Sequence, residues 1–335
     1  MSNKRLLTGI KPTGAPHIGN FFGAIQPALG LSSEENMESL FFIADYHALT
    51  TVKNAAQLKL LSLQVAASWL ACGLDPSKVL FYRQSDISEI FELNWILSCV
   101  VAKGLLNRAH AYKALVDANH SSKKDPDKNI NMGVFNYPIL MAADILLFNT
   151  TCVPVGIDQK QHVEIARDIA QNFNKIFGDV FVVPEIIIQK NQTCIVGIDG
   201  RKMSKNYNNT IPLFEDESVI KKRVMSIKTE SLSVDAVKDP DSCSLFSLFQ
   251  LFASSDDVNR VRNHYLEGGL AYGTLKQELL GNMLSFLTPF RERYDHYMSN
   301  PQEIALYLTE GAAQVRSIAR ETLSRVRSAM GLDSL

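Results

Sequence analysis

The sequence predicts an α/β protein in which a doubly wound parallel sheet is followed by an all-helical region. Over the first 212 residues, short apolar runs alternate with amphipathic helical stretches, a pattern typical of consecutive β-α-β units on a parallel sheet. After about residue 212 the helical stretches continue, and no further run reads as a strand. We therefore expect two domains, residues 1–212 and residues 213–335, which is an ordinary number for a chain of 335 residues.

The elements of the first domain are placed by their apolar periods and by the residues that end them. The first strand is expected at residues 5–9, where it leads into a glycine-rich turn. Gly73, Gly104 and Gly178 follow three long helical stretches, as expected of glycines that end a helix. Pro138 is a natural first residue for another helix. Further strands are expected at 39–45, 79–82 and 153–155, and helices from about 18 and at 55–72, 87–103, 138–148 and 158–177.

The composition excludes several classes of protein. Hydrophobic residues make up 46% of the chain and charged residues 21%, as in an ordinary globular protein. The net charge of −1 argues against a protein that binds a polyanion over its whole surface, but it allows a local basic patch. The N-terminus has no apolar run of signal-peptide length, and the apolar run at 139–148, interrupted by Asp144, is too short to span a bilayer. Scattered cysteines without a C-x-x-C pair indicate reduced thiols and a cytoplasmic protein: Cys72, Cys99, Cys152, Cys194 and Cys243.

Two short segments, far apart in the chain, carry the groups that bind a phosphate chain. Residues 14–20 read Gly-Ala-Pro-His-Ile-Gly-Asn at the start of the first helix, and residues 202–206 read Lys-Met-Ser-Lys-Asn. Glycines let the backbone approach a phosphate, a helix N-terminus and lysines supply positive charge, and His17 and Asn20 can donate hydrogen bonds. Taken alone, the first segment could equally be a connector with a surface histidine, and the second a solvated loop. Together they favour adenylate chemistry.

The two segments resemble the HIGH and KMSKS motifs of the class I aminoacyl-tRNA synthetases, with Asn20 in place of the final histidine of the first and Asn206 in place of the final serine of the second. Residues 42–50, 137–147 and 153–162 resemble the bacterial tryptophanyl members of that family, so the resemblance covers nearly the whole chain. It implies a Rossmann-like catalytic domain at 1–212, with a dimerisation insertion at about 79–155 and a KMSKS-type loop at about 195–212, and a helical tRNA-anticodon-binding domain at 213–335.

The resemblance implies a two-step reaction. The carboxylate of L-tryptophan attacks the α-phosphorus of ATP, which gives tryptophanyl-adenylate and pyrophosphate, and the tryptophanyl group then passes to the terminal adenosine of tRNA(Trp). Because no protein nucleophile takes part, catalysis consists of positioning and of stabilising phosphate charge. ATP and Mg²⁺ are the implied cofactors, without metal ligands from protein side chains. The residues implied for catalysis are His17, Asn20, Lys113, Lys202 and Lys205, and those implied for ATP are Ile10, Lys11, Pro12, Thr13, Gly19, Asn20, Gly156, Ile157, Asp158, Lys202, Met203, Ser204 and Lys205. Asp158 is also a candidate N-cap of the helix that follows it.

Recognition of tryptophan requires a hydrogen-bond acceptor, because the indole N–H can only donate and costs about 1–3 kcal/mol when it is buried unpaired. Asp144, a carboxylate in an apolar run, is the candidate, although an amphipathic helix could also direct it to solvent. The resemblance places Tyr137 and Gln159 at the substrate's ammonium group, and places His47 near the pocket; without the resemblance, His47 reads as a structural histidine. The implied apolar walls are Leu7, Gly9, Met141, Ile145, Val153 and Val155.

Some residues depart from the family pattern. Lys11 stands where many bacterial members have glutamine and Leu115 where a second lysine is common, so we expect Lys11 to replace part of the lost positive charge. The polar stretch between residues 112 and 136 predicts a long loop, a candidate lid that orders on ATP binding. The basic residues of the second domain are candidates for tRNA phosphate contacts or for a solvated helix face: Lys221, Lys222, Arg223, Arg316, Arg320, Arg325 and Arg327.

Two other functions stay open beside the tryptophan reaction. Tyrosyl-tRNA synthetases carry the same two motifs, but Leu7 on the first strand and Asp144 in the apolar helix favour indole over phenol. A paralogue without catalysis could bind RNA or an amino acid as a regulator, but His17, Lys202 and Lys205 are all present. For the enzyme, the resemblance implies a homodimer.

Overall fold

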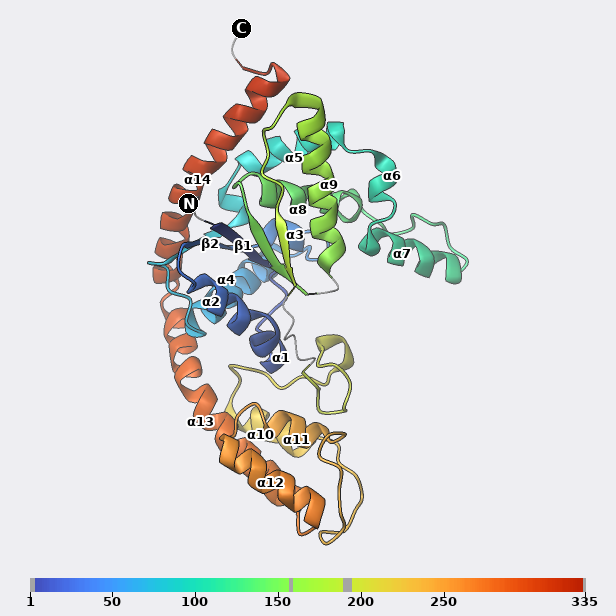
Figure 1. Cartoon of the computed structure of the whole chain (residues 1–335), viewed down its shortest axis with the longest axis vertical. Helices are drawn as coiled ribbons and strands as arrows, with labels where there is room; N and C mark the ends of the chain where they lie inside the picture. The colour runs from blue at the N-terminus through green and yellow to red at the C-terminus, as the bar shows by residue number, and fades with distance from the viewer. Residues whose placement is uncertain (1–3, 157–158, 189–194, 334–335) are drawn as a thin grey trace.

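Parallel strands buried on both faces form the centre of the molecule. The computed structural model describes residues 4–156, 159–188 and 195–333. Its strands form one five-stranded parallel sheet in the order β3-β2-β1-β4-β5, with helices on both faces (Figure 1). The doubly wound parallel sheet predicted from the sequence is therefore confirmed. The strands are β1 (Lys4–Ile10), β2 (Met37–Ile43), β3 (Val79–Arg83), β4 (Cys152–Val155) and β5 (Glu185–Ile188).

The side chains of the central strands alternate between two hydrophobic clusters. Leu6 of β1 and Phe41 of β2 pack with α4 (Ala55–Ala71) on one face of the sheet. Leu7 and Leu40, which are partners in the β1–β2 register, pack with α8 (Met132–Leu146) and α9 (Lys160–Phe177) on the other face. Because helices cover both faces, residues 39–43 of β2 are buried without a break, whereas β1 buries only Leu6 and Leu7.

The strand order leaves a crevice at the carboxyl ends of β1 and β4. From β1 the chain proceeds through β2 to β3 on one side, and β4 then returns to the other side of β1. The order therefore reverses between β1 and β4. In open parallel sheets, ligands bind at the carboxyl ends of the strands at such a switch point.

The helices of the sheet domain follow the expected order, and two predicted helix ends are confirmed. Gly73 and Gly178 follow α4 and α9 with φ angles of +109° and +91°, a backbone conformation that favours glycine. The remaining helical segments are α1 (Ile18–Asn20), the π-helical segment η1 (Phe21–Ile25), α2 (Gln26–Ser32), α3 (Asp45–Ala48), the 3₁₀ turn η2 (Gln84–Asp86), α5 (Glu89–Val100), α6 (Lys103–Leu106) and α7 (His110–Ser121).

The predicted helix at 87–103 is too long. The helix α5 ends at Val100 because Val101 adopts an extended backbone, with φ of −78° and ψ of 129°. Gly104 lies inside the short helix α6 and does not end α5. The edge strand β5 is a further difference, since no strand was predicted there. It has four residues, begins directly after Pro184 and is only partly buried, so its sequence pattern is weak.

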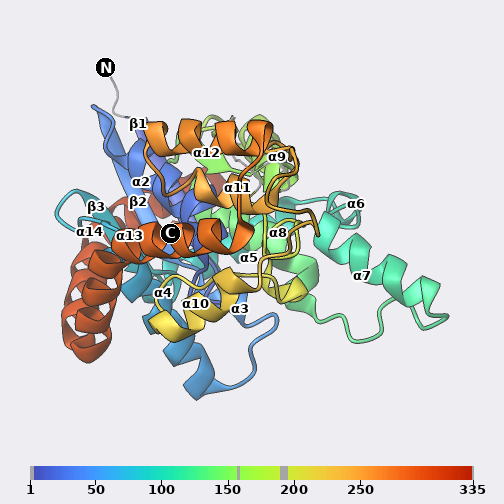
Figure 2. The same ribbon diagram turned by 90° about the horizontal axis from the view of Figure 1, so that it is seen from below.

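The long loop predicted between residues 112 and 136 is only partly confirmed, because helices occupy residues 112–121 and 132–136 and the loop is limited to residues 122–131. The helix α7 projects from the body of the molecule and has no buried residue (Figures 1 and 2), which explains the missing apolar period. Pro138 lies inside α8 and does not open it. Asn131 caps that helix instead, since its side chain accepts a hydrogen bond from the Val134 N–H at 3.1 Å.

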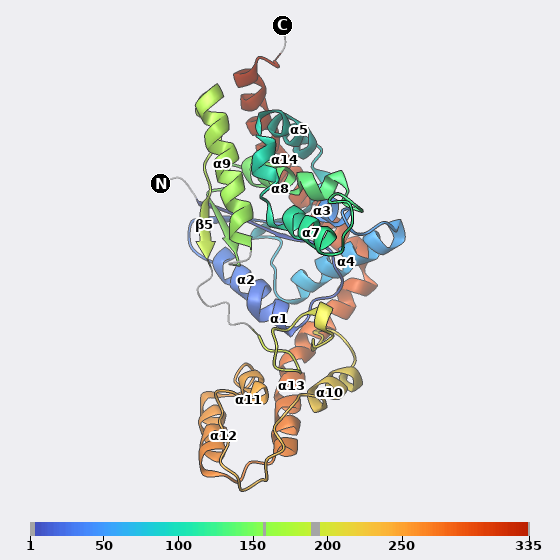
Figure 3. The ribbon, with the colours of Figure 1, turned by 90° about the vertical axis from the view of Figure 1, so that its right-hand side faces the viewer.

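The helical region after residue 212 is confirmed, and it does not lie wholly apart from the sheet. In Figures 1 and 3, α10, α11 and α12 form a group below the sheet, whereas α13 runs up against α4 and α14 passes along β3. A Cβ atom on Gly311 of α14 would lie 2.0 Å from the carbonyl oxygen of Phe81, so glycine permits this close packing. The bounds are α10 (Glu217–Met225), α11 (Ser244–Phe249), α12 (Ser255–Glu267), α13 (Tyr272–Ser299) and α14 (Pro301–Met330), and the 3₁₀ turn η4 (Lys205–Tyr207) precedes them.

Arginines of α14 fasten that helix to the sheet domain. Arg327 pairs with both carboxylate oxygens of Glu92 at 2.5 and 2.6 Å, and Arg320 donates to Glu89 at 3.0 Å. Arg316 donates to the carbonyl oxygen of Asp86, and Arg325 donates to Asn149 at 2.7 Å. These guanidinium groups are thus engaged within the chain, which neither predicted alternative, phosphate contact or solvated face, anticipated. On α10, Lys221 and Lys222 stay exposed.

None of the helices in the described part of the chain combines the length and the apolar character that a membrane span requires. Cys72 and Cys152 are buried, Cys243 is partly buried and Cys99 is exposed, and all four are unpaired. Cys194 lies outside the described residues.

Candidate active site

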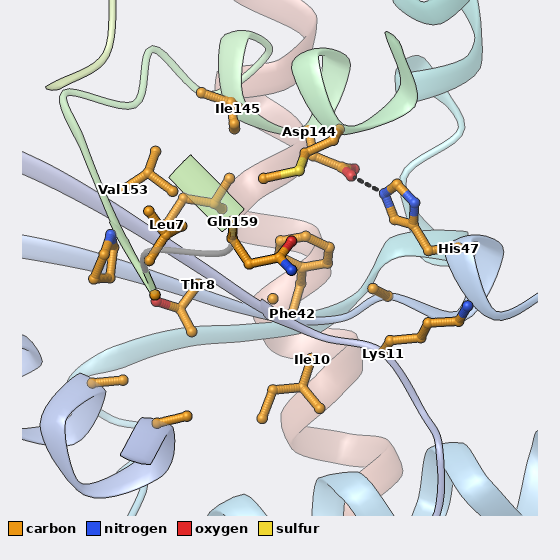
Figure 4. A pocket seen from close by; sticks show the side chains of 18 of the residues that line it. Leu7, Thr8, Ile10, Lys11, Phe42, His47, Asp144, Ile145, Val153 and Gln159 are labelled. Atoms are coloured by element: carbon orange, nitrogen blue, oxygen red, sulfur yellow. Dashed lines mark hydrogen bonds and ion pairs between the residues drawn. The ribbon is translucent and has the colours of Figure 1, made fainter. Parts of the chain in front are cut away.

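A cavity of about 480 Å³ lies in the crevice at the carboxyl ends of β1 and β4 (Figure 4). Its size is ordinary for a small-molecule site. One wall is the end of β1, and the others come from α8 and from β4 with the residues that follow it. All ten residues predicted to surround the amino-acid substrate line this cavity: Leu7, Gly9, His47, Tyr137, Met141, Asp144, Ile145, Val153, Val155 and Gln159.

Asp144 is a buried carboxylate at the wall of this cavity, with 1% of its surface exposed. It therefore does not face solvent, the alternative that an amphipathic helix allowed. Its Oδ2 accepts a hydrogen bond from Nε2 of His47 at 2.8 Å, and Nε2 of Gln84 donates to Oδ1 and Oδ2 at 2.8 and 2.9 Å (Figure 4 shows the His47 contact). Burial raises the pKa of Asp144, and the hydrogen bonds from His47 and Gln84 oppose that shift. The carboxylate is therefore a fixed acceptor.

A second set of polar residues consists of Gln159, Tyr137 and His162, and the side chain of Gln159 points into the cavity in Figure 4. Its Oε1 accepts a hydrogen bond from Nδ1 of His162 at 2.8 Å. The ring of Tyr137 meets the rings of His47 and His162 edge-on, with centroid distances of 4.6 and 5.3 Å. Burial raises the pKa of Tyr137, so its hydroxyl stays protonated at neutral pH. This end of the cavity thus offers neutral oxygen atoms that can accept hydrogen bonds.

Gly9 keeps the β1 wall of the cavity open. A Cβ atom at this position would lie 2.4 Å from the ring of Phe42, which lines the same cavity. Any larger residue would displace that ring. The glycine therefore lets β1 and the aromatic side chain approach each other closely.

A smaller cavity of about 260 Å³ adjoins the first one at the turn after β1. Gly14 and Asn20 of the first predicted phosphate segment line it, as do Thr13 directly before that segment and Lys205 of the second. The two cavities meet at residues that line both of them: Gly9, Ile10, Lys11, Ala24 and Trp69. An apolar site with a carboxylate and a site with cations are thus neighbours.

The two phosphate segments are in direct contact although they are 184 to 192 residues apart in the sequence. Nζ of Lys205 donates to the carbonyl oxygen of Thr13 at 3.0 Å, and the N–H of Gly19 points to Sδ of Met203 at 3.3 Å. The N–H of Ile18 also donates to the carbonyl of residue 211 at 3.0 Å. The sequence expectation that both segments form one site is consistent with this geometry.

Burial and charge modify the titrating groups at the smaller cavity and beside it, where His17 lines a neighbouring cavity together with Pro16 and Lys205. Burial, followed by the positive charge of Lys205, lowers the pKa of His17 to about 4. The imidazole is therefore neutral at pH 7. Burial also lowers the pKa of Lys11 and of Lys205, and Nζ of Lys11 donates to Oγ1 of Thr50 at 3.0 Å. Cations that have lost part of their water interact more strongly with an anionic ligand.

Similarity to known proteins extends over nearly the whole chain. The family model described as tRNA synthetases class I (W and Y) matches residues 2–288. The tryptophan–tRNA ligase of Pseudomonas aeruginosa is 50% identical over 334 residues, which are 99% of this chain and 74% of that protein. The ligase of the same name from Neisseria meningitidis serogroup A is 47% identical and covers 100% of both chains. The crystal structure of tryptophanyl-tRNA synthetase from Campylobacter jejuni, complexed with ADP and tryptophan, matches with a TM-score of 0.89 and 40% identity over 98% of this chain and 100% of that one.

The chain belongs to the class I tRNA synthetases. The resemblance predicted from the sequence is thereby confirmed, including its tryptophanyl branch, and so is an enzyme of the aminoacyl-tRNA synthetase type. The helices that flank the parallel sheet agree with the structures of this family.

The structure of this synthetase does not bring every predicted residue to the two cavities. Lys113 is exposed on the projecting helix α7, together with Leu115. Lys202 is exposed at the start of its loop. Ile157 and Asp158 lie outside the described residues, whereas their neighbour Gly156 lines the larger cavity.

Sequence reasoning missed two polar residues of the site, Thr8, which lines the larger cavity, and Gln84, which lies behind it. Gln84 is fully buried and holds Asp144, yet no motif marks it. A positional signal was available: Gln84 directly follows the predicted strand at 79–82, and the carboxyl ends of parallel strands share one edge of the sheet. A glutamine at that position was a candidate for the site.

Proposed function

We propose that this synthetase activates L-tryptophan with ATP and then transfers the tryptophanyl group to tRNA(Trp). The observation that carries the proposal is Asp144, a buried carboxylate at the wall of a largely apolar cavity. The side chain of tryptophan combines a large apolar ring system with a single polar group, the indole N–H, which can only donate a hydrogen bond. The Campylobacter jejuni relative, which was solved with ADP and tryptophan, supports both ligands.

In the proposed binding mode the indole ring lies in the larger cavity and its N–H donates to Asp144. Tyr137 and Gln159 bind the ammonium group, and this directs the substrate carboxylate toward the smaller cavity. Burial of an aromatic side chain is worth about 1.5–3 kcal/mol, and pairing of the N–H avoids a further cost of about 1–3 kcal/mol. The walls that contact the ring are Leu7, Gly9, Met141, Ile145, Val153 and Val155, with His47 beside Asp144.

ATP in this proposal lies along the end of β1, with its phosphates in the smaller cavity. Ile10, Lys11, Pro12 and Thr13 follow the nucleotide, and Gly156 with residues 157 and 158 binds the ribose. Neutral His17 and the Asn20 side chain contribute hydrogen bonds to phosphate without adding a formal charge. Gly19 and the loop residues Lys202, Met203, Ser204 and Lys205 complete the phosphate site.

The site is compatible with a Mg²⁺ ion that is held by the phosphate oxygens of ATP. Among the described residues, no group of three or more His, Cys, Asp or Glu side chains is placed to hold a metal ion, and the polar side chains that line the smaller cavity are cations and neutral groups without a carboxylate. Mg²⁺ usually binds phosphate oxygens and waters with few protein ligands, and it would neutralise charge on the leaving pyrophosphate.

The protein's part in the chemistry is to place the two substrates in line and to stabilise charge. Binding both in adjoining cavities sets the substrate carboxylate against the α-phosphorus, which replaces a bimolecular encounter. Lys205 donates to the Thr13 carbonyl oxygen at 3.0 Å, beside the smaller cavity, and we propose that it also stabilises the leaving phosphates. Lys202 would act with it. Lys113 would contribute only if α7 approached the site.

The transfer step is tested by charging purified tRNA(Trp) with radiolabelled tryptophan. We expect the label in acid-precipitable tRNA to increase with time and to depend on ATP. Charging of tRNA(Tyr) with tyrosine instead, or of neither tRNA, would contradict the proposal.

We also propose that the enzyme is a homodimer that uses the outer face of α5. Phe91, Trp95 and Cys99 follow one another at four-residue spacing on this helix, and all three are exposed, with Trp95 at 70%. An exposed stripe of this kind is typical of an interface. Sedimentation equilibrium should report a dimer for the wild type and a monomer for Trp95→Glu. An unchanged dimer would refute this face.

The remaining assignments follow from tRNA charging. We propose that the helices after residue 213 bind the anticodon region of tRNA, with Lys221 and Lys222 of α10 as exposed phosphate contacts. We place the enzyme in the cytoplasm, because aminoacyl-tRNA is consumed there by translation.

A further inference from the structure

Gln84 is a buried residue that contacts Asp144 of the candidate active site but does not itself line the cavity. It has 0% of its surface exposed and lies in η2, directly after β3. Its Nε2 donates to both oxygens of Asp144 at 2.8 and 2.9 Å, and its Oε1 accepts from the backbone N–H of His47 at 3.4 Å. A carboxylate can only accept and a backbone N–H can only donate, so these partners fix which way the amide points.

We propose that Gln84 is a positioning residue for tryptophan recognition, which holds the plane of the Asp144 carboxylate so that one acceptor site faces the cavity. A carboxylate has about four acceptor sites on its two oxygens. His47 uses one of them on Oδ2, and Gln84 uses one on each oxygen. The acceptor site that is left is on Oδ1. This inference rests on the proposed function, in which the indole N–H takes that site.

The turn that carries Gln84 is itself held by different parts of the protein. The Ile87 N–H donates to the Gln84 carbonyl at 3.1 Å, and Asp45 at the start of α3 accepts from the N–H of Ser85 at 3.0 Å and from its hydroxyl. Arg316 of α14 donates to the carbonyl of Asp86. Successive residues of η2 are therefore anchored to the active site, to α3 and to α14. A side chain on such a fixed turn can orient a ligand-binding group accurately.

The test compares tryptophan with the isosteric analogue in which sulfur replaces the indole N–H. Dissociation constants of both are measured by calorimetry for the wild type and for Gln84→Met, which keeps the length of the side chain but removes its donors. We expect Gln84→Met to weaken tryptophan binding about 10-fold and to change the affinity for the sulfur analogue by less than about twofold. Gln84→Asn, whose amide is too short to reach both oxygens, should give an intermediate loss. Gln161→Met, the same change on α9 away from the cavity, should leave both affinities unchanged.

The outcomes separate this inference from the proposed function on which it rests. Equal losses for both ligands would mean that Gln84 only supports the fold, and no loss would mean that it does not orient Asp144; either result overturns the inference. Asp144→Asn serves as the reference. If it leaves the preference for tryptophan over the sulfur analogue intact, the role of Asp144 in the proposed function fails. If it removes the preference while Gln84→Met does not, only the inference fails. Where thermal unfolding shows that Gln84→Met does not fold, Gln84→Asn decides between these results.

Discussion

Replacing Asp144 with alanine should separate amino-acid recognition from phosphate chemistry. The change removes the acceptor proposed for the indole N–H, a hydrogen bond to a charged group. Such a bond contributes about 1.5–3 kcal/mol, which corresponds to roughly a 10- to 150-fold increase in the dissociation constant of tryptophan. The variant also leaves the buried donors of His47 and Gln84 without their acceptor. Each unpaired donor costs about 1–3 kcal/mol, so the free energy of unfolding should fall as well.

Calorimetric titration with tryptophan and with ATP, together with thermal unfolding, tests this prediction. We expect the affinity for tryptophan to fall within the stated range and the affinity for ATP to change little, since the hydrogen-bond partners of Asp144 among the described residues are His47 and Gln84, which are not phosphate-site residues. Asp117→Ala, which removes an exposed carboxylate on α7, is the control and should change neither. An unchanged tryptophan affinity in the folded Asp144→Ala variant, or an equal loss for both ligands, would refute the reasoning.

Further variants test the phosphate site, the packing of α14 and the titration of His17. Lys205→Ala should slow adenylate formation by about 10²–10³-fold in single-turnover measurements while tryptophan affinity is retained; a rate within about threefold of the wild type would count against its role. Lys11→Ala should weaken ATP binding or slow activation, and if both stay unchanged then Lys11 does not supply the missing charge. Gly311→Ala should lower the unfolding temperature, because its Cβ would lie 2.0 Å from a carbonyl oxygen of β3, with a typical overpacking cost of about 1–3 kcal/mol. Gly281→Ala, whose Cβ meets nothing within 4 Å, is the matched control and should not lower it. Folding lowers the pKa of His17 from 6.5 to about 4, so between these pH values the unfolded chain binds the proton more readily than the folded one. The free energy of unfolding is therefore unaffected by this group above pH 6.5 and falls as the pH is lowered toward 4. Denaturant titrations from pH 7 to 4 should therefore show a shallower loss for His17→Gln, and identical slopes would contradict the shift.

The features that could be predicted from the sequence are those with a local signal. The strand β2 is buried on both faces and contains the apolar run at residues 40–43, and Gly73 and Gly178 follow their helices with positive φ. The larger cavity gathers every residue proposed for the amino acid because α8 and α3 lie over the carboxyl ends of β1 and β4.

The features that were missed depend on contacts between distant parts of the chain. The helix α7 has no buried residue, so no apolar period revealed it, and the loop on which the proposed lid rested is limited to residues 122–131. The arginines of α14 find partners on α5 and η2 only once the chain has folded. The position of Gln84 in the site likewise becomes visible only through its hydrogen bonds to Asp144, 60 residues away in the sequence. Such roles follow from tertiary structure, which one sequence does not display.

Amino-acid-dependent exchange of pyrophosphate into ATP tests most directly the central claim, that the adjoining cavities form tryptophanyl-adenylate. The purified enzyme is incubated with Mg²⁺, ATP and labelled pyrophosphate, and with tryptophan, tyrosine or no amino acid. We expect exchange with tryptophan, with a preference over tyrosine of about 10⁴-fold or more, because the site pairs with the indole N–H. Exchange with tyrosine at a comparable rate, or no exchange with tryptophan, would contradict the account.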